Sequence, residues 1–139
     1  MTRRADRVFL DANVLFSVAY RPESRLGSLW SLTGVKLLTS SLALGEARRN
    51  LYVHRPEGVE RLDELARGMT VVDRPVCAIP AGLGLAEKDV HVLAAALQAR
   101  CTHLITGDHR HFGELFGRVV EGVKIITPSQ YLADRLAEE

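Results

Sequence analysis

Two aspartates, Asp11 and Asp108, each follow a short apolar run that predicts a buried strand. The runs are Val8–Leu10 and His103–Gly107. In open parallel sheets, ligands bind beyond the carboxyl ends of the strands. Neighbouring strands lie roughly 4.8 Å apart, so carboxylates at adjacent strand ends could share one cation. We therefore expect chemistry at this edge of the sheet.

Two further acids stand out because they lie on apolar helical patterns. Asp89 falls in the first turn of the clearest predicted helix, on the face shared with Leu93. Glu46 interrupts a mostly apolar helix, one turn before Arg49. Alone, Asp89 could simply complement the positive helix N-terminus, and Glu46 could pair with Arg49 on the surface. Each position by itself is therefore ambiguous.

The four carboxylates together favour a metal site over local structural roles. Asp11 and Asp108 could instead cap the turns that follow them. However, carboxylates that crowd together repel one another, and a hard divalent cation relieves that repulsion. Mg²⁺ and Mn²⁺ both accept oxygen ligands, and a bound ion can activate water and stabilise charge on a phosphate. The pattern therefore suits phosphodiester hydrolysis.

The bulk properties describe an ordinary globular protein. With 139 residues, 47% hydrophobic residues and 25% charged residues, we expect a single domain over 1–139. No apolar run approaches the roughly 20 residues of a membrane helix, so we expect no membrane partner. Two cysteines without Cys-x-x-Cys spacing favour a reduced, cytoplasmic setting. A net charge of +1 does not itself indicate nucleic acid, and an excess of arginine over lysine is weak evidence for phosphate binding.

Short apolar strands alternate with helices along the chain, which predicts a parallel sheet covered on both faces. Five strands are predicted. Two of them end near Leu10 and near Asp108, and the other three span 36–39, 69–72 and 123–126. The predicted helices span 23–33, about 41–53, 59–67 and 87–100. A last helix is predicted to begin after Thr127, which would be its N-cap. A short turn or helix is expected over 109–116, and the longest loop over 74–85. The fold class is therefore α/β.

Four segments resemble the PIN-domain ribonucleases, a family that includes the toxins of VapBC-type toxin–antitoxin pairs. They occur in the family's order and cover nearly the whole chain: residues 8–15, Glu46, residues 88–96 and residues 104–108. The resemblance implies a three-layer α/β/α fold with a central five-stranded parallel sheet, in which the strands before Asp11 and Asp108 are neighbours. The motif around His91 looks closer to the broader group of PIN-like proteins than to the toxin branch.

The resemblance also implies a site and an activity. Asp11, Glu46, Asp89 and Asp108 would form the acidic metal site, which would bind Mg²⁺ or Mn²⁺. Asn13 would support the first aspartate, and Thr106 would lie beside the site; each could equally be an ordinary polar residue of a turn or strand. The implied function is a metal-dependent endoribonuclease, plausibly a toxin with an antitoxin partner and an RNA substrate. A homodimer is also implied, through residues such as Leu29, Trp30 and Leu44, which could instead be core.

The sequence Asp-His-Arg-His after the last strand raises the question of a transition-metal site. Residues i and i+2 point apart on a helix, so for His109 and His111 we expect solvated surface rather than metal ligation. His109, Arg110 and Arg48 are instead candidates for contact with RNA phosphates near the acids.

Other functions fit the residues less well. A phosphatase with an aspartyl nucleophile requires a second aspartate where this chain has Asn13, and a receiver domain would require an acidic pair there. No Gly-rich loop suggests a nucleotide-binding module. The alternative that stays open is a PIN-like domain that binds RNA or protein without cleavage.

Overall fold

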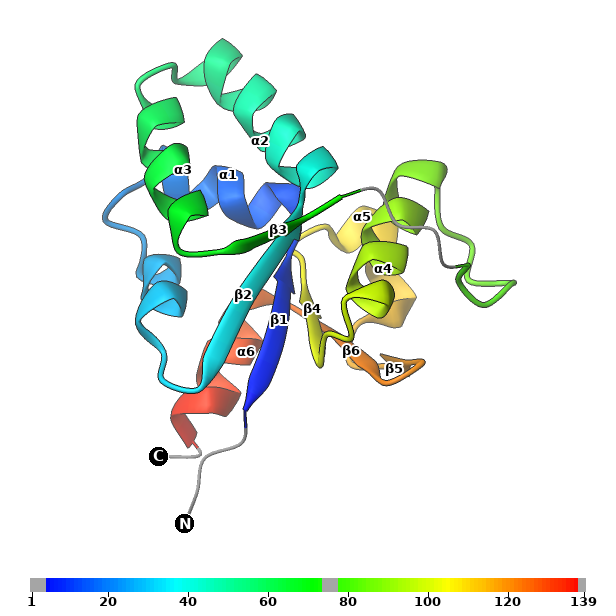
Figure 1. The fold of residues 1–139 in the computed structure, drawn as a ribbon. Coiled ribbons are helices and arrows are strands. Elements are labelled where there is room, and N and C mark those ends of the chain that lie inside the picture. The colour runs from blue at the N-terminus through cyan, green and yellow to red at the C-terminus, as the bar shows by residue number, and fades with distance from the viewer. Residues whose placement is uncertain (1–4, 74–77, 138–139) are drawn as a thin grey trace.

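A computed structural model describes residues 5–73 and 78–137. Six strands form one twisted sheet in the order β3-β2-β1-β4-β6-β5 (Figure 1). The strands are β1 (Asp6–Leu10), β2 (Val35–Ser40), β3 (Thr70–Val72), β4 (His103–Ile105), β5 (Val119–Val120) and β6 (Val123–Ile126). All neighbours are parallel except β5 and β6. The predicted adjacency of β1 and β4 at the centre is confirmed.

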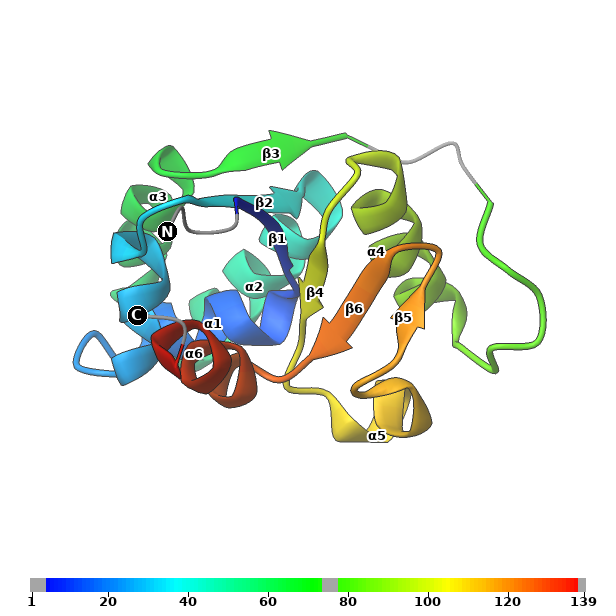
Figure 2. The ribbon, with the colours of Figure 1, turned by 90° about the horizontal axis from the view of Figure 1, so that it is seen from below.

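Helices cover both faces of the sheet, as the three-layer prediction requires (Figures 1 and 2). Alternate strand residues point to opposite faces, so Val8 and Leu10 join one core and Phe9 joins the other. The first core contains α1 (Ala12–Tyr20), the 3₁₀ helix η1 (Arg25–Ser31), α2 (Ser41–His54), α3 (Gly58–Arg67) and α6 (Pro128–Ala137). The second contains α4 (Glu87–Gln98), α5 (His109–Phe112) and the 3₁₀ turn η2 (Gly113–Leu115).

Local sequence explains where several helices begin. Ser40 accepts a hydrogen bond from the Ala43 amide and caps α2, as predicted. Thr127 accepts a hydrogen bond from the Gln130 amide at the start of α6, with Pro128 in the first helical position. The loop predicted before α4 contains no helix or strand over 78–86, and residues 74–77 lie outside the described residues.

Three predictions about the elements need correction. The sheet has six strands rather than five, because β5 pairs antiparallel with β6 through a two-residue turn. Glu121 and Gly122 both have positive φ, which suits the tight turns that join antiparallel strands. The helix expected over 23–33 is a shorter 3₁₀ helix, and a helix that had not been predicted, α1, directly follows β1.

The proposed dimer residues lie against the interior of the single chain. Leu29 is 1% exposed and belongs to the first core. The Trp30 indole donates a hydrogen bond to the Leu65 carbonyl, and Leu44 packs against the same core. Leu29 is therefore not available as a contact surface.

Candidate metal centre

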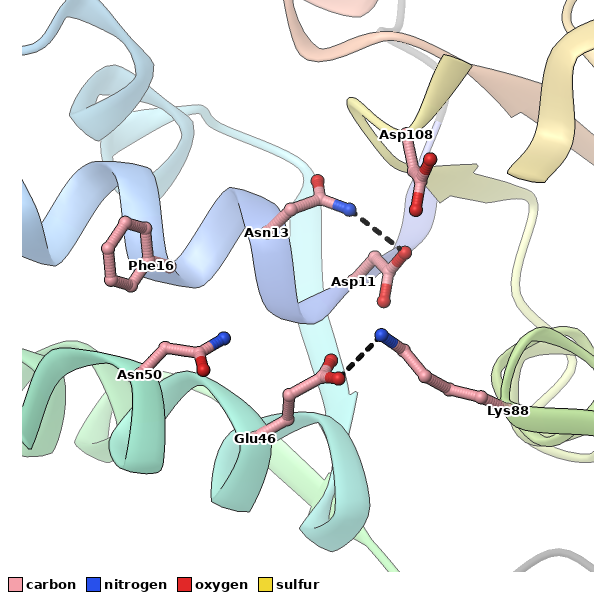
Figure 3. A pocket seen from close by; sticks show the side chains of 7 residues that line it. All are labelled: Asp11, Asn13, Phe16, Glu46, Asn50, Lys88 and Asp108. Atoms are coloured by element: carbon pink, nitrogen blue, oxygen red, sulfur yellow. Dashed lines mark hydrogen bonds and ion pairs between the residues drawn. The ribbon is translucent and has the colours of Figure 1, made fainter. Parts of the chain in front are cut away.

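Three predicted acids line one pocket at the carboxyl edge of the sheet. Asp11 follows β1, Asp108 lies beyond β4, and Glu46 extends from α2 (Figure 3). The pocket has a volume of about 160 Å³, which accommodates several water molecules. Its other lining residues are Asn13, Phe16, Asn50 and Lys88. The topology thus brings together carboxylates that are up to 97 positions apart in the sequence.

Hydrogen bonds hold the Asp11 carboxylate in one orientation. Its Oδ1 accepts a bond of 2.7 Å from the Ala12 amide, which makes Asp11 the N-cap of α1. Its Oδ2 accepts bonds from the Thr106 hydroxyl at 2.9 Å and from Asn13 Nδ2 at 3.2 Å. Asp11 is only 3% exposed, so these donors replace most of the water that an ionised carboxylate would otherwise bind.

Asn13 and Thr106 connect the two strand ends. Leu10 is in register with Ile105, so Asp11 and Thr106 continue side by side beyond the paired strands. Asn13 Oδ1 accepts the Gly107 amide at 2.8 Å, and the Thr106 hydroxyl accepts the Asp108 amide at 3.1 Å. A Cβ at Gly107 would lie 3.3 Å from Asn13 Oδ1, so a side chain there would press on this contact. The supporting roles predicted for Asn13 and Thr106 stay predictions, with this geometry in their favour.

Asp89 and Asp108 meet at the side chain of His111. The Nδ1 atom of His111 lies 2.8 Å from Asp108 Oδ2 and 3.0 Å from Asp89 Oδ2. Asp108 also caps α5 by accepting the His111 amide at 3.0 Å. Asp89 is 1% exposed, and α4 presents it from its first turn. The short α5 thus places an imidazole beside two of the predicted acids.

Glu46 is paired with a lysine rather than with Arg49. Lys88 Nζ lies 2.5 Å from Glu46 Oε1, and both side chains line the pocket (Figure 3). Lys88 immediately precedes Asp89 on α4, and sequence reasoning did not single it out. Its position next to Asp89 was the only hint in the sequence that Lys88 lies near the acids. The contact itself depends on the tertiary structure, which brings Lys88 of α4 to Glu46 of α2.

The crowded charges shift the ionisation of the site. Burial raises the pKa of Asp11, and the charges of Glu46 and Asp89 raise it further, against the hydrogen bonds from Thr106 and Ala12. Burial also raises the pKa of Asp89, with Asp108 adding to the effect and His111 opposing it. The hydrogen bond to Glu46 is the main reason that the pKa of Lys88 is raised. Burial, together with mutual repulsion, thus makes the ionised acids costly in the absence of a cation.

The residues fit a divalent cation. Asp89 Oδ2 is buried and has no hydrogen bond of its own among the described residues, since it shares the nearby His111 Nδ1 with Asp108 Oδ2. Such a carboxylate oxygen is unfavourable unless a cation binds it. One ligand atom each from Asp89, Asp108 and His111 can be chosen so that all three lie within 4.8 Å of one another. The other donors of the site are carboxylate oxygens, which hard divalent ions prefer.

The three residues suggested for RNA contact, Arg48, His109 and Arg110, differ in their surroundings. Arg48 forms an ion pair with Asp63 of α3 and does not line the acidic pocket. The His109 ring packs on Phe116 with 4.8 Å between ring centroids, whereas Arg110 is exposed. Their contacts with RNA stay predictions. His111 is exposed, as expected, but its Nδ1 also faces two carboxylates, which was not expected.

The model of a family described as the PIN domain matches residues 7–110, which include all four acids. The chain belongs to the PIN-domain family. The match supports the resemblance based on the four motifs and covers most of the 139 residues. No curated protein matches the sequence.

Solved structures with the same fold include two that are described as VapBC structures. VapBC2 from Rickettsia felis, bound to a DNA fragment from their promoter, has a chain that is 13% identical with a TM-score of 0.61. PAE2754 from Pyrobaculum aerophilum is 17% identical with a TM-score of 0.60, and VapBC-1 from nontypeable Haemophilus influenzae is 14% identical with a TM-score of 0.60. The alignments cover 87%, 97% and 88% of this PIN-domain chain and 98%, 99% and 98% of those chains. None of the helices described is long and apolar enough to cross a membrane.

Proposed function

We propose that this PIN-domain protein is a divalent-metal-dependent endoribonuclease and acts as the toxin of a type II toxin–antitoxin pair. The observation that carries the proposal is the convergence of Asp11, Glu46, Asp89 and Asp108 from four separate segments. A purely structural role does not account for so many acids at one place, because their mutual repulsion opposes folding. The family match supports a nuclease, and the shared fold with VapBC chains supports the toxin assignment.

The four acids would hold Mg²⁺ or Mn²⁺, directly or through water. An ion held by these acids would lower the pKa of a bound water molecule and would stabilise negative charge on the phosphate. The Thr106 hydroxyl and the Asn13 amide both donate to Asp11 Oδ2, which favours the ionised carboxylate and fixes its orientation. Hydrolysis in this site requires no covalent nucleophile from the protein.

Glu46 would accept a proton, and Lys88 would bind the negative charge of the substrate. Glu46 is partly exposed and borders the pocket, so its carboxylate is placed to accept the proton of the attacking water. The Lys88 side chain is 55% exposed, which leaves its ammonium free to move from Glu46 to a substrate phosphate. The two residues would then separate as substrate enters.

The proposed partners follow from the same family assignment. The VapBC structures are complexes, and we propose that this chain likewise binds an antitoxin, forms a homodimer and works in the cytoplasm. RNA is the proposed substrate because the family resemblance points to ribonucleases.

The first experiment measures cleavage of mixed single-stranded RNAs with Mn²⁺, Mg²⁺ or EDTA. Wild type, Asp11→Asn and the control Asp63→Asn, which changes an α3 aspartate outside the pocket, are purified identically. Cleavage that requires metal, disappears in Asp11→Asn and persists in Asp63→Asn supports the proposal. Equal cleavage by wild type and Asp11→Asn contradicts it.

The same variants test the alternative of a binding module without catalysis. RNA or protein binding that is independent of metal and survives in Asp11→Asn, with no cleavage by folded wild type, would favour that alternative. Circular dichroism of both proteins establishes that the comparison is between folded chains.

A further inference from the structure

The His111 imidazole is held where a ligand atom of the metal site would lie. Its Nδ1 atom is 2.8 Å from Asp108 Oδ2 and 3.0 Å from Asp89 Oδ2. Asp108 precedes α5 and His111 is in it, and the amide of His111 donates to Asp108 Oδ1. The backbone of this short turn therefore fixes the ring relative to the carboxylate.

Hydrogen bonding alone does not satisfy this arrangement. A ring nitrogen carries at most one hydrogen, so Nδ1 cannot donate fully to two carboxylate oxygens at once. Asp89 Oδ2 is buried and is the more distant of the two oxygens that share Nδ1, and it has no hydrogen bond of its own within the described parts of the chain. A divalent cation that binds Asp89 Oδ2, Asp108 Oδ2 and His111 Nδ1 together would satisfy the Asp89 oxygen.

The distances also match a coordination sphere. Octahedral ions with bonds of about 2.1 Å separate neighbouring ligand atoms by about 3.0 Å. The two distances from His111 Nδ1 are close to this value. One ligand atom each from Asp89, Asp108 and His111 lie within 4.8 Å of one another.

We propose that His111 is a nitrogen ligand of the divalent ion, together with Asp89 and Asp108, and makes the site selective for Mn²⁺ over Mg²⁺. The inference rests on the proposed metal-dependent function and adds a residue and a metal preference to it. Imidazole nitrogen binds first-row transition ions well, whereas Mg²⁺ takes oxygen ligands and retains its water. Replacing an oxygen ligand by Nδ1 therefore favours Mn²⁺.

The direct test is pulsed electron paramagnetic resonance of the full chain loaded with Mn²⁺. Coupling of the Mn²⁺ electron spin to a directly bound ¹⁴N is expected in wild type and lost in His111→Gln. His109→Gln is the matched control. His109 is only two positions from His111, but its ring packs on Phe116. Labelling histidine with ¹⁵N should replace the ¹⁴N signal and thus assign it to an imidazole.

Metal affinities separate ligation from mere positioning. The ratio of the Kd for Mg²⁺ to that for Mn²⁺ should fall about tenfold in His111→Gln and stay unchanged in His109→Gln. His111→Asp, which restores an oxygen ligand, should bind Mg²⁺ more tightly than His111→Gln and show no nitrogen coupling. A residue that only positions Asp89 and Asp108 would change both affinities equally.

Three results would overturn the inference, and they are distinguishable. Mn²⁺ bound without nitrogen coupling, or an unchanged affinity ratio in folded His111→Gln, refutes His111 as a ligand but leaves the acidic metal site intact. A folded wild type that binds neither ion refutes the inference and the proposed metal-dependent function together.

Discussion

At the scale of single residues, the ammonium of Lys88 supplies a positive charge next to the acids of the site. Its ammonium contacts Glu46 and interacts electrostatically with Asp11 and Asp89. A positive charge at this position repels a divalent ion and attracts a phosphate. Lys88 should therefore weaken metal binding while it strengthens substrate binding.

We predict that Lys88→Gln binds Mn²⁺ several-fold more tightly and raises the KM for RNA. Titration calorimetry measures the first effect, and steady-state cleavage measures the second. Lys36→Gln, which removes an exposed lysine of β2, is the control and should change neither value. Weaker Mn²⁺ binding in Lys88→Gln would show that the lysine supports the site rather than competing with the ion.

Arg49 and Arg48 are adjacent in α2 but differ in their surroundings. Arg49 lines a second pocket together with Glu46, Lys88 and His91, and this pocket adjoins the acidic one because Glu46 and Lys88 line both. Arg48 is instead paired with Asp63. We infer that a bound RNA strand extends over Arg49.

We predict that Arg49→Gln weakens RNA binding more than Arg48→Gln does. The loss of one phosphate contact to single-stranded RNA should reduce the slope of log K against log salt concentration by about 0.7. Binding is measured by fluorescence anisotropy in the Asp11→Asn background, in which no cleavage is expected. An equal or larger effect of Arg48→Gln would place the strand on the other side of α2.

Burial is the main influence on the ionisation of Cys101. The residue is 4% exposed, and burial raises the pKa of its thiol from the usual 9.0 to about 11. The thiolate fraction at about pH 8 is therefore about 100-fold lower than for an ordinary thiol. In a Cys77→Ser background, we predict that Cys101 reacts with a thiol reagent only after denaturation. Rapid reaction of the folded protein would contradict this.

The same shift determines how stability depends on alkaline pH. Because the folded pKa lies above the unfolded one, the contribution of Cys101 is complete below about pH 9 and is lost as the pH rises towards about 11. Urea denaturation should show that Cys101→Ala, in the same background, reduces this alkaline loss of stability.

At the scale of elements, the strands and most helices could be predicted because their apolar spacing is regular. The antiparallel β5 could not, since two residues are too few for a pattern. The helix α1 had a usable signal, because Asp11 is an N-cap and Val14, Leu15, Val18 and Ala19 are all buried on one side. The turn-capping role considered for Asp11 is in fact the N-cap of this helix.

The candidate site was predictable where it follows from strand ends and not where it depends on packing. The register of β1 and β4 places Asp11 beside Thr106. The approach of His111 to Asp89 and of Lys88 to Glu46 depends instead on how α5, α4 and α2 pack, which local periodicity does not contain. The sequence therefore revealed the acids before their cationic and imidazole neighbours.

The attachment of α6 to β1 depends on a buried ion pair. Arg135 Nη1 lies 2.9 Å from Asp6 Oδ2, which also accepts the Tyr131 hydroxyl at 2.6 Å. A second guanidinium nitrogen donates to the Thr33 carbonyl at 2.8 Å. Both charged side chains are fully buried. The cluster joins the last helix to the first strand.

We predict that Arg135→Met lowers the free energy of unfolding by about 3–5 kcal/mol, because it leaves the Asp6 carboxylate buried without its countercharge. Asp6→Asn combined with Arg135→Met should cost less than the sum of the single changes. Urea denaturation of the four proteins measures both effects. A loss below about 1 kcal/mol in Arg135→Met would mean that the pair contributes little to the attachment.

At the scale of the whole molecule, the acidic site opposes folding while the surrounding layers support it. Burial and mutual repulsion raise the pKa values of Asp11 and Asp89, so their ionised forms at neutral pH cost free energy of folding. The elements that place these acids, β1 and α4, lie far apart in the sequence. A cation that relieves the repulsion should therefore stabilise the fold as a unit.

We predict that Mn²⁺ at about 100 times its Kd raises the free energy of unfolding by about 2.7 kcal/mol and the Tm by roughly 10 °C. Scanning calorimetry measures the shift, and EDTA should reverse it. Asp11→Asn should show a much smaller shift, whereas Asp63→Asn should behave like wild type. An equal shift in Asp11→Asn would place the stabilising ion elsewhere, because linkage requires that the ion bind the folded site that the variant alters.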